Sequence, residues 1–451
     1  MLFAVSSCRK DLLLNKLYLF SYPSIHPPMK KIGVIFFLLS MIFPLFAQKE
    51  SSVQLKPYGC VCNYMCYDTR ESVNIIDEMF HIMPKDVLLN EDGTEDLNDV
   101  DKFTYVSIVS RLGLNLSGVQ LGKAQLSAKM EADFCGSGNM NTLLRIRQAY
   151  VALDWAHIRL LCGQAWHPMV DQMMPTVVGV ATGSPFAPFN CSPQVRMVAS
   201  LGKGWSATVA ALYQASNASV GPDGASAIYA KWSRIPECYV SFKYAGEHLT
   251  VGAGVDVLGV MPRSISTVTR SIEQGDGTMQ SQAVRVRVND RVWGFSPEIF
   301  ASYKKDKFNI MGKVMYAQNT SHLTMVSGYG ATSFDSTTGR YEYSPLNSAV
   351  SWVNATYGER WKAGLMLGYV QNLGSFKEFI SLEDFWVRGA KNTNYLYRIS
   401  PSVTYTINRF QLAFEVDYTV VGYGDLALNG CSEALRRVDG LRACFMLKYS
   451  F

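Results

Sequence analysis

Acidic and basic side chains alternate with apolar ones in the stretch Lys123–Tyr150. The first part has a strict period of two, which indicates a β-strand with one apolar and one polar face. A segment rich in Gly and Asn then turns the chain, and the following residues run back. In an antiparallel hairpin, Arg145 and Arg147 would lie beside Asp133 and Glu131 on the polar face. Such a face can look onto solvent, onto a buried site or into a pore, and each alternative implies a different function.

Catalytic and metal-binding residues do not occur in a recognisable arrangement. The histidines of the mature chain are His81, His157, His167, His248 and His322. None of them shows the His-x₃-His or related spacing of metal ligands. His157 and His167 are candidates for a general base, but no serine in a Gly-x-Ser-x-Gly setting or paired acid matches them as a nucleophile. The sequence therefore predicts no enzyme, no metal site and no other cofactor.

The cysteines near the start of the mature chain look superficially like a metal cluster. Cys60, Cys62 and Cys66 share their parity with Tyr58 and Tyr64, so one apolar strand face would carry all five side chains. Cysteine packs well as a small hydrophobic residue. The pattern favours apolar filling over a metal cluster or a disulfide among the three cysteines.

The composition indicates an exported, folded β protein. Of 451 residues, 48% are hydrophobic and 18% are charged, and Tyr, Phe and Gly are abundant. Residues 29–47 read as a signal peptide, and residues 1–28 read as a mis-assigned upstream extension before a true start at Met29. Removing both segments takes away mostly basic side chains, which leaves residues 48–451 nearly neutral. A near-neutral chain gives no electrostatic reason to expect nucleic acid as a partner.

Strand periodicity recurs along the mature chain. Alternating segments include 248–257, 308–318, 410–418 and 441–451, the last of which ends in an aromatic residue. No apolar run after the leader is long enough for a membrane-spanning helix. No internal repeat of roughly 20–50 residues indicates a propeller or a β-helix. A soluble β-sandwich would share the alternation, but export and one uninterrupted β pattern favour a barrel.

The connections between these segments come in two sizes. Tight ones at 245–247, 304–307 and 407–409 are consistent with hairpin turns. Long ones lie at about 68–100, 166–194, 263–282, 318–348 and 423–437. The pattern predicts an all-β fold, a transmembrane antiparallel β-barrel of about 16 strands (roughly 14 to 18). Short periplasmic turns and long extracellular loops would join the strands in a bacterial outer membrane.

The connection Trp166–Gln194 is the best candidate for a segment that narrows the barrel. It is rich in Pro and Gly, yet it also carries Met, Val and Phe side chains. An apolar loop of this kind is a poor surface for solvent. We expect it to fold into the barrel as a constriction, with a neighbouring subunit as the alternative surface that it would cover.

Short strings spread over residues 55–451 resemble the DcaP-like outer-membrane porins of the Bacteroidetes. They include Lys56–Gly59, Tyr67–Ser72, Ser110–Gly113, Glu131–Phe134, Arg145–Tyr150, Gly163–Pro168, Pro193–Val195, Gly252–Leu258 and Gly368–Gly374. The resemblance implies about 16 strands, a homotrimer in outer-membrane lipid and lipopolysaccharide, and passive uptake of small anionic, dicarboxylate-like solutes. Two features depart from the family: the cysteine-rich first strand, and the absence of coiled-coil heptads before the barrel.

Arginines on the lumen wall would favour anions. The candidate pore-lining residues are Arg111, Glu131, Asp133, Arg145, Arg147, Arg196, Arg285 and Arg287. Arg285 and Arg287 alternate with valines, which indicates a strand with a polar side. Glu131 and Asp133 would temper the positive field of the neighbouring arginines. The alternative for each arginine is an ion pair that holds the wall together.

A second function is also compatible with the pattern. The barrel could be structural or adhesive, with a plugged lumen and long loops that bind a surface partner. Conductance in a planar bilayer would distinguish the two hypotheses, because only a porin is expected to give stepwise open currents.

Overall fold

The structure is a computed structural model that describes residues 53–75, 80–136, 143–181, 183–215, 217–273, 275, 277–433 and 436–451. The predicted upstream extension (1–28) and signal peptide (29–47) lie outside these residues. Helix in the described chain is confined to α2 (Pro168–Asp171), α3 (Ile228–Ser233) and the 3₁₀ turn η2 (Ser321–Leu323). None of these helices has the length and hydrophobicity needed to cross a membrane.

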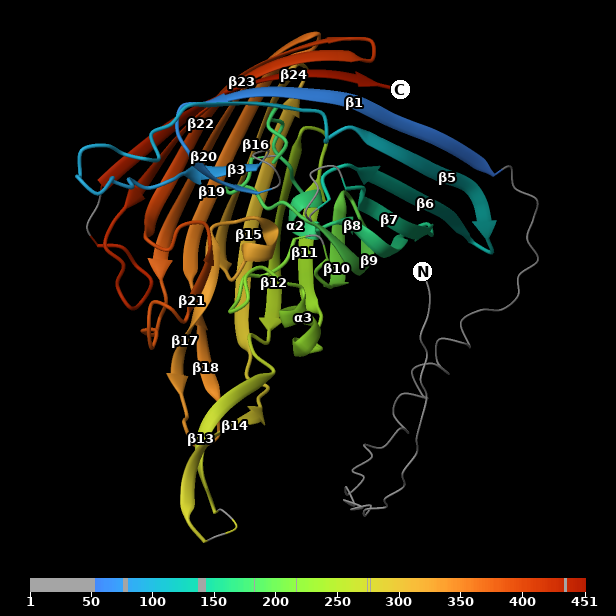
Figure 1. Cartoon of the computed structure of the whole chain (residues 1–451). Coiled ribbons are helices and arrows are strands. Elements are labelled where there is room, and N and C mark those ends of the chain that lie inside the picture. The colour runs from blue at the N-terminus through green and yellow to red at the C-terminus, as the bar shows by residue number, and fades with distance from the viewer. Residues whose placement is uncertain are drawn as a thin grey trace, which may run out of the picture. The chain divides into compact units, whose positions relative to one another are not determined.

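Sixteen antiparallel strands close a barrel in which each strand pairs with its neighbours in the chain (Figure 1). In order they are β1 (Gln54–Asp68), β5 (Arg111–Leu121), β6 (Ala124–Asp133), β7 (Arg145–Asp154), β8 (Ile158–Trp166), β9 (Cys191–Gly202), β10 (Trp205–Leu212), β11 (Glu237–Ala245), β12 (Leu249–Val260), β15 (Val292–Lys305), β16 (Phe308–Gln318), β19 (Asn347–Gly358), β20 (Trp361–Gly374), β22 (Thr393–Ile407), β23 (Phe410–Tyr423) and β24 (Arg436–Ser450). The short strand β4 (Lys102–Val106) precedes β5 along the same edge of β1. Pairing of β1 with β24 closes the sheet, so the predicted all-β barrel is confirmed.

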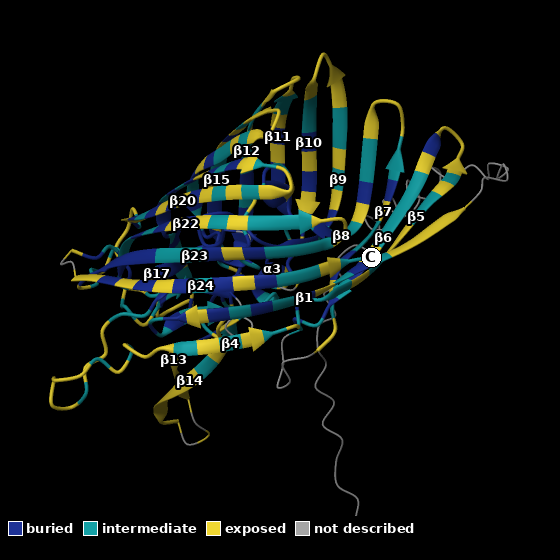
Figure 2. Cartoon of the chain, turned by 90° about the horizontal axis from the view of Figure 1, so that it is seen from above, coloured by how far each residue is buried: buried dark blue, intermediate teal, exposed yellow. Residues whose placement is uncertain are grey.

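The two faces of the barrel strands differ in exposure, as the alternating bands of buried and exposed residues in Figure 2 show. On β15 and β16, Ile299 and Val314 are 68% and 62% exposed on the outer face, whereas Glu298 and Lys313 point inward and are buried. An apolar outer wall with all strands paired is what a lipid environment requires. Because successive side chains of a strand point to opposite faces, the polar residues of these strands face the lumen.

The barrel has turns of two or three residues at one end and long connections at the other. Two-residue turns join β15 to β16 and β22 to β23. In these turns Asp306 and Asn408 adopt the left-handed conformation, with φ of 50° and 54°, which short polar residues tolerate. The predicted tight turns at 304–307 and 407–409 are therefore confirmed.

Several long connections contain strands of their own outside the barrel sheet. β13 (Ile265–Glu273) and β14 (Met279–Arg287) form a hairpin that extends away from the barrel strands in Figure 1. β17 (Ser327–Phe334), β18 (Tyr341–Pro345) and β21 (Phe385–Arg388) form a second small sheet. The predicted long connections at 263–282 and 318–348 are present, and β-branched and aromatic residues in them favour extended pairing.

Two segments fold into the barrel. One is the connection 167–190 between β8 and β9, which we call the inward loop. The other is the hairpin of β2 (Ser72–Ile75) and β3 (Phe80–Pro84), which we call the lumen hairpin. Phe186 of the inward loop is fully buried, and a Cβ at Gly368 of β20 would lie 2.3 Å from its ring. The predicted inward fold of this connection is confirmed.

Candidate functional site

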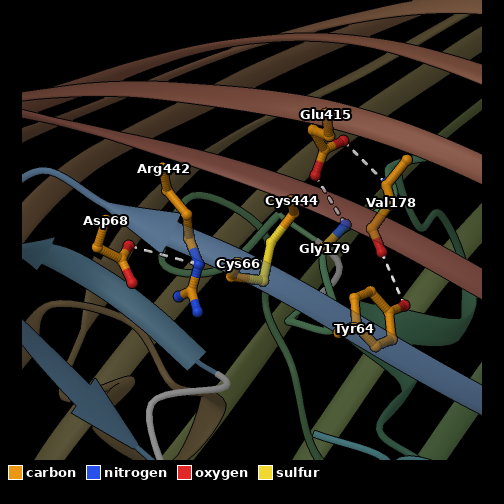
Figure 3. The surroundings of a disulfide bond; sticks show 8 residues. All are labelled: Tyr64, Cys66, Asp68, Val178, Gly179, Glu415, Arg442 and Cys444. Atoms are coloured by element: carbon orange, nitrogen blue, oxygen red, sulfur yellow. Dashed lines mark hydrogen bonds and ion pairs between the residues drawn. A yellow bond between two sulfur atoms is a disulfide. The ribbon is translucent and has the colours of Figure 1, made fainter. Parts of the chain in front are cut away.

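The inward loop crosses the lumen. Side chains of the opposite wall bind its tip, which consists of Val178 and Gly179. Glu415 of β23 accepts hydrogen bonds from the backbone N–H groups of Val178 (2.8 Å) and Gly179 (2.7 Å). The Tyr64 hydroxyl of β1 donates to the Val178 carbonyl at 2.9 Å (Figure 3). These bonds satisfy backbone groups that would otherwise be costly to bury. The tip is thereby fixed at one position across the barrel.

Arg398 of β22 connects both inward segments to the wall. Its guanidinium donates to the carbonyl of Ser184 in the inward loop at 3.1 Å. It also donates to the carbonyls of His81 and Ile82 in the lumen hairpin, at 3.0 and 3.1 Å. One buried cation therefore sets the relative position of the two segments.

A disulfide closes the seam between the first and last barrel strands. Cys66 and Cys444 are register partners on β1 and β24, and their sulfur atoms are bonded (Figure 3). On the same face, Asp68 forms an ion pair with Arg442 at 3.5 Å. The prediction of apolar filling is wrong for Cys66. Its partner lies 378 residues away in the sequence. The alternation of residues around Cys66 therefore could not predict this disulfide.

Two cavities lie on the two sides of the loop tip and share Tyr64, Val177, Gly179 and Val180. The first, of about 30 Å³, has mixed charge and is lined by Arg398, Arg442, Glu415 and Asp417 among others. A space of this size holds only about two water molecules. The passage is therefore narrow at the loop tip.

The second cavity, of about 300 Å³, is basic. Its charged lining residues are Arg111, Lys362 and Lys448, and no acidic residue of the described chain lines it. Its hydrogen-bonding residues are Thr176, Thr356, Ser402, Thr404, Thr406 and Gln411. We call this space the basic cavity. It combines positive charge with hydroxyl groups that can donate to an anion.

The predicted charged face of β6 and β7 forms a cluster of ion pairs on the lumen side. Arg145 lies 2.7 Å from Asp133, and Arg147 lies 3.0 Å from Glu131 and 3.1 Å from Asp133. Only 3% of the Arg147 side chain is exposed. A bulge between Glu131 and Ala132 brings Arg147 within reach of both acids. The predicted juxtaposition is confirmed, and its arginines are paired.

The remaining predicted arginines lie in three settings. Arg111 lines the basic cavity, and Arg196 of β9 pairs with Asp171 of α2 at 2.8 Å. Arg285 and Arg287 occupy exposed positions of β14, which pairs only with β13. The expectation that Arg285 and Arg287 line the lumen wall is wrong, because period two identifies a strand but not the sheet to which it belongs.

Several lumen residues were missed at the sequence level. They are Lys362, Arg398, Glu415, Arg442 and Lys448. The signal was present, because Glu415, Arg442 and Lys448 stand on the polar parity of the alternating segments 410–418 and 441–451. The predicted site concentrated on one hairpin, whereas the lumen residues come from strands around the closed barrel.

No protein-family model and no curated protein matches this sequence. The fold is nevertheless similar to solved structures of bacterial outer-membrane proteins. The crystal structure of the outer membrane channel DcaP of Acinetobacter baumannii aligns with a TM-score of 0.61 at 18% identity, over 90% of this chain and all of that one. Outer-membrane expressed OmpT of Vibrio cholerae aligns with a TM-score of 0.50 at 12% identity, over 89% of this chain and 99% of that one.

These identities are low, so the likeness concerns the fold. The closed barrel of 16 strands and its apolar outer face are features of proteins that span the outer membrane. The chain is thus a β-barrel of a bacterial outer membrane with a DcaP-like porin fold.

Proposed function

We propose that this barrel is a passive diffusion channel that favours small anionic, dicarboxylate-like solutes. The observation that carries the proposal is the basic cavity, where Arg111, Lys362 and Lys448 converge without a lining acid. Lysine and arginine in a lumen are the means by which pores favour anions. The hydroxyl groups beside them can replace part of the hydration of a carboxylate.

The size of the basic cavity supports a small solute. At about 300 Å³ it lies at the lower end of ligand-sized pockets, which span roughly 300–1,000 Å³. One unpaired cation at about 8 Å from a carboxylate contributes about 2 kcal/mol at an effective dielectric constant of about 20. Salt reduces this value, but several such cations still bias partitioning toward anions.

The paired arginines are assigned a smaller role in selectivity. Arg145, Arg147 and Arg196 each lie next to carboxylates, so their fields are largely cancelled. Within the proposal, Lys362 and Lys448 supply most of the selectivity, because Arg111 lies opposite Asp133 in the register of β5 and β6. The cluster with Glu131 and Asp133 supports the wall beside them.

The proposal includes a homotrimer in outer-membrane lipid and lipopolysaccharide. It is supported by the resemblance of the sequence strings to the DcaP-like porins of the Bacteroidetes. Native mass measurement of the detergent-solubilised protein tests this part. A monomer under conditions that preserve other porin trimers would contradict it.

The channel is tested with purified protein in planar bilayers. We expect stepwise currents and, in asymmetric KCl, a reversal potential that reports anion preference, with a small dicarboxylate lowering the chloride current. Neutralising the basic cavity by Arg111→Gln, Lys362→Gln and Lys448→Gln should remove the preference. A control replaces Lys203 and Lys305, two exposed lysines at the end of the barrel with the short turns, with Gln. Absence of conductance, or unchanged selectivity in the triple variant, would refute the proposal.

A structural or adhesive barrel is the second candidate. The β13–β14 hairpin favours it, because this hairpin extends from the barrel and carries the exposed Arg285 and Arg287 (Figure 1). Deletion of residues 265–287 should abolish binding to a surface partner and leave conductance unchanged if this function holds.

A further inference from the structure

Four buried polar side chains from four different segments meet between the barrel wall and the inward loop. They are His167 at the start of the inward loop, Glu237 of β11, Asp256 of β12 and His322 of η2. His167 Nε2 lies 2.9 Å and His322 Nε2 lies 2.8 Å from Glu237 Oε1. Asp256 Oδ1 is 4.0 Å from His167 Nε2. The four side chains are at most 2% exposed, so solvent does not reach them.

The charges of this group are not balanced by the described residues around it. Neither Glu237 nor Asp256 forms an ion pair with a described Lys or Arg. The neighbouring Lys313 is already paired with Glu298 at 2.6 Å. Glu237 Oε2 and Asp256 Oδ1 receive no hydrogen bond from a described donor. Two buried carboxylates without a cation are unfavourable, since burial of a charge requires a partner.

Hydrogen bonds alone account for the group only in part. Both imidazoles can donate from Nε2 to one oxygen of Glu237, and His167 Nδ1 then accepts from the Met169 amide at 3.2 Å. This arrangement leaves His322 Nδ1 without a donor. A proton on one of the two carboxyl groups would remove one of the two negative charges. The remaining negative charge could be balanced within the group only by a second proton on an imidazole. That proton would find no described acceptor at His322 Nδ1 and would oppose the Met169 amide at His167 Nδ1.

We propose that His167, Glu237, Asp256 and His322 bind one divalent transition-metal ion of the Zn²⁺ class. Two imidazoles with carboxylates form a ligand set that suits Zn²⁺, whereas Mg²⁺ and Ca²⁺ prefer oxygen ligands alone. The ligand atoms of His167, Glu237 and His322 already lie within 4.8 Å of one another. A double positive charge would neutralise both carboxylates.

Metal binding by the two histidines would replace some of their present hydrogen bonds. A neutral imidazole that binds metal through Nε2 carries its proton on Nδ1. For His167 this replaces the contact with the Met169 amide, which must shift. Ligation through Nε2 also replaces the two hydrogen bonds from the imidazoles to Glu237 with bonds to the metal. The gain from neutralising two buried carboxylates exceeds the loss of these hydrogen bonds.

The ion would connect three parts of the lumen lining. His167 begins the inward loop, His322 lies in the connection between β16 and β17, and Glu237 and Asp256 belong to the wall. Bound metal would therefore fix the base of the inward loop, as Glu415 fixes its tip. This inference does not depend on anion selectivity, because it concerns a separate group of residues.

The test uses the purified full-length barrel after treatment with a chelator and return to chelator-free buffer. Zn²⁺ alone is the probe, and bound metal is measured by mass spectrometry of the elements after desalting. We expect about one Zn²⁺ per chain and a higher thermal unfolding temperature with Zn²⁺ in the wild type. His322→Ala and Glu237→Gln should each lose at least tenfold in affinity. His248→Ala, which removes an exposed histidine at a turn, should bind as the wild type does.

Two results would overturn the proposal. One is wild-type protein that folds but retains no stoichiometric Zn²⁺ and shows no thermal shift, which would favour protonation of the group. The other is equal binding by His322→Ala and the wild type. If the alanine variant does not fold, His322→Gln keeps a hydrogen-bond donor toward Glu237 without imidazole ligation. The absorption of bound Co²⁺ then reports whether two imidazoles remain in the ligand set.

Discussion

The ion-pair cluster of β6 and β7 and the basic cavity contain the same types of cation in different surroundings. In the cluster, Arg147 lies between Glu131 and Asp133 and is almost fully buried. In the basic cavity, Lys362 and Lys448 line open space with no acid among the lining residues. The number of arginines on a lumen wall therefore does not determine the electrostatic field inside the lumen. Pairing decides whether a cation stabilises the wall or acts on a solute.

The two regions should also differ in their tolerance of substitution. Removing one member of a buried ion pair leaves an uncompensated charge, which is expensive. Removing a cation that faces a water-filled cavity leaves no such charge. Stability should therefore report on the cluster, and selectivity should report on the cavity.

The largest effect is expected for Arg147→Ala. It leaves Glu131 buried without its nearest guanidinium and should lower the free energy of unfolding by about 3–5 kcal/mol. Urea unfolding in detergent measures the change. The matched control is Arg159→Ala, because the side chains of Arg159 and Asp154 are 42% and 36% exposed and a surface pair is worth at most about 1 kcal/mol. Equal effects of the two substitutions would contradict the distinction between buried and exposed pairs.

The seam between β1 and β24 offers a covalent counterpart to the ionic cluster. Cys66→Ala with Cys444→Ala should lower the free energy of unfolding by about 2–4 kcal/mol, because the unfolded chain regains the freedom that the crosslink removes. The control is Cys162→Ala, which replaces an exposed free cysteine. A reducing agent should destabilise the wild type and not the double variant. Unchanged unfolding of the double variant would show that pairing of the strands alone holds the seam.

Ion selectivity should also distinguish the cluster from the basic cavity, and the expected change in free energy is smaller than the changes in stability. Lys362→Gln with Lys448→Gln should shift the anion-to-cation permeability ratio several-fold, since each charge contributes about 1–2 kcal/mol before salt screening. Arg145→Gln with Asp133→Asn removes one charge of each sign and should leave the ratio unchanged. Reversal potentials in asymmetric salt measure both. A changed permeability ratio in the second double variant would show that the ion-pair cluster also contributes to selectivity.

Part of this arrangement could be predicted from the sequence. The alternation in 410–418 and 441–451 separated a polar from an apolar face and placed Glu415 and Arg442 on the polar one, although the candidate site did not include them. The apolar character of 166–194 predicted that it would fold into the barrel. Both predictions depend on local patterns, in which each residue is compared with its near neighbours.

Contacts between distant segments could not be predicted in this way. The partner of Cys66 becomes its neighbour only when β24 closes the barrel. His167 and His322 meet Glu237 from positions 70 and 85 residues away, so no ligand spacing appears in the sequence. For Arg285 the strand was predicted from the local pattern, but the pattern did not show that this strand lies outside the barrel sheet.

The smallest effect is expected from pH acting on the lumen hairpin. Burial and the nearby cations Arg398, Arg442 and Lys102 hold the pKa of His81 well below its usual value. A depressed histidine pKa means that the contribution to stability is complete above the unfolded value of about 6.5 and is lost as the pH falls below it. The loss should reach about 1.4 kcal/mol at a pH of about 5.5. His81→Gln should unfold with a weaker pH dependence between pH values of about 7.5 and 5.5, and urea midpoints measure the difference. Identical pH dependence in the two proteins would mean that the lumen hairpin leaves its site before His81 is protonated, so that Arg398 holds the inward loop alone.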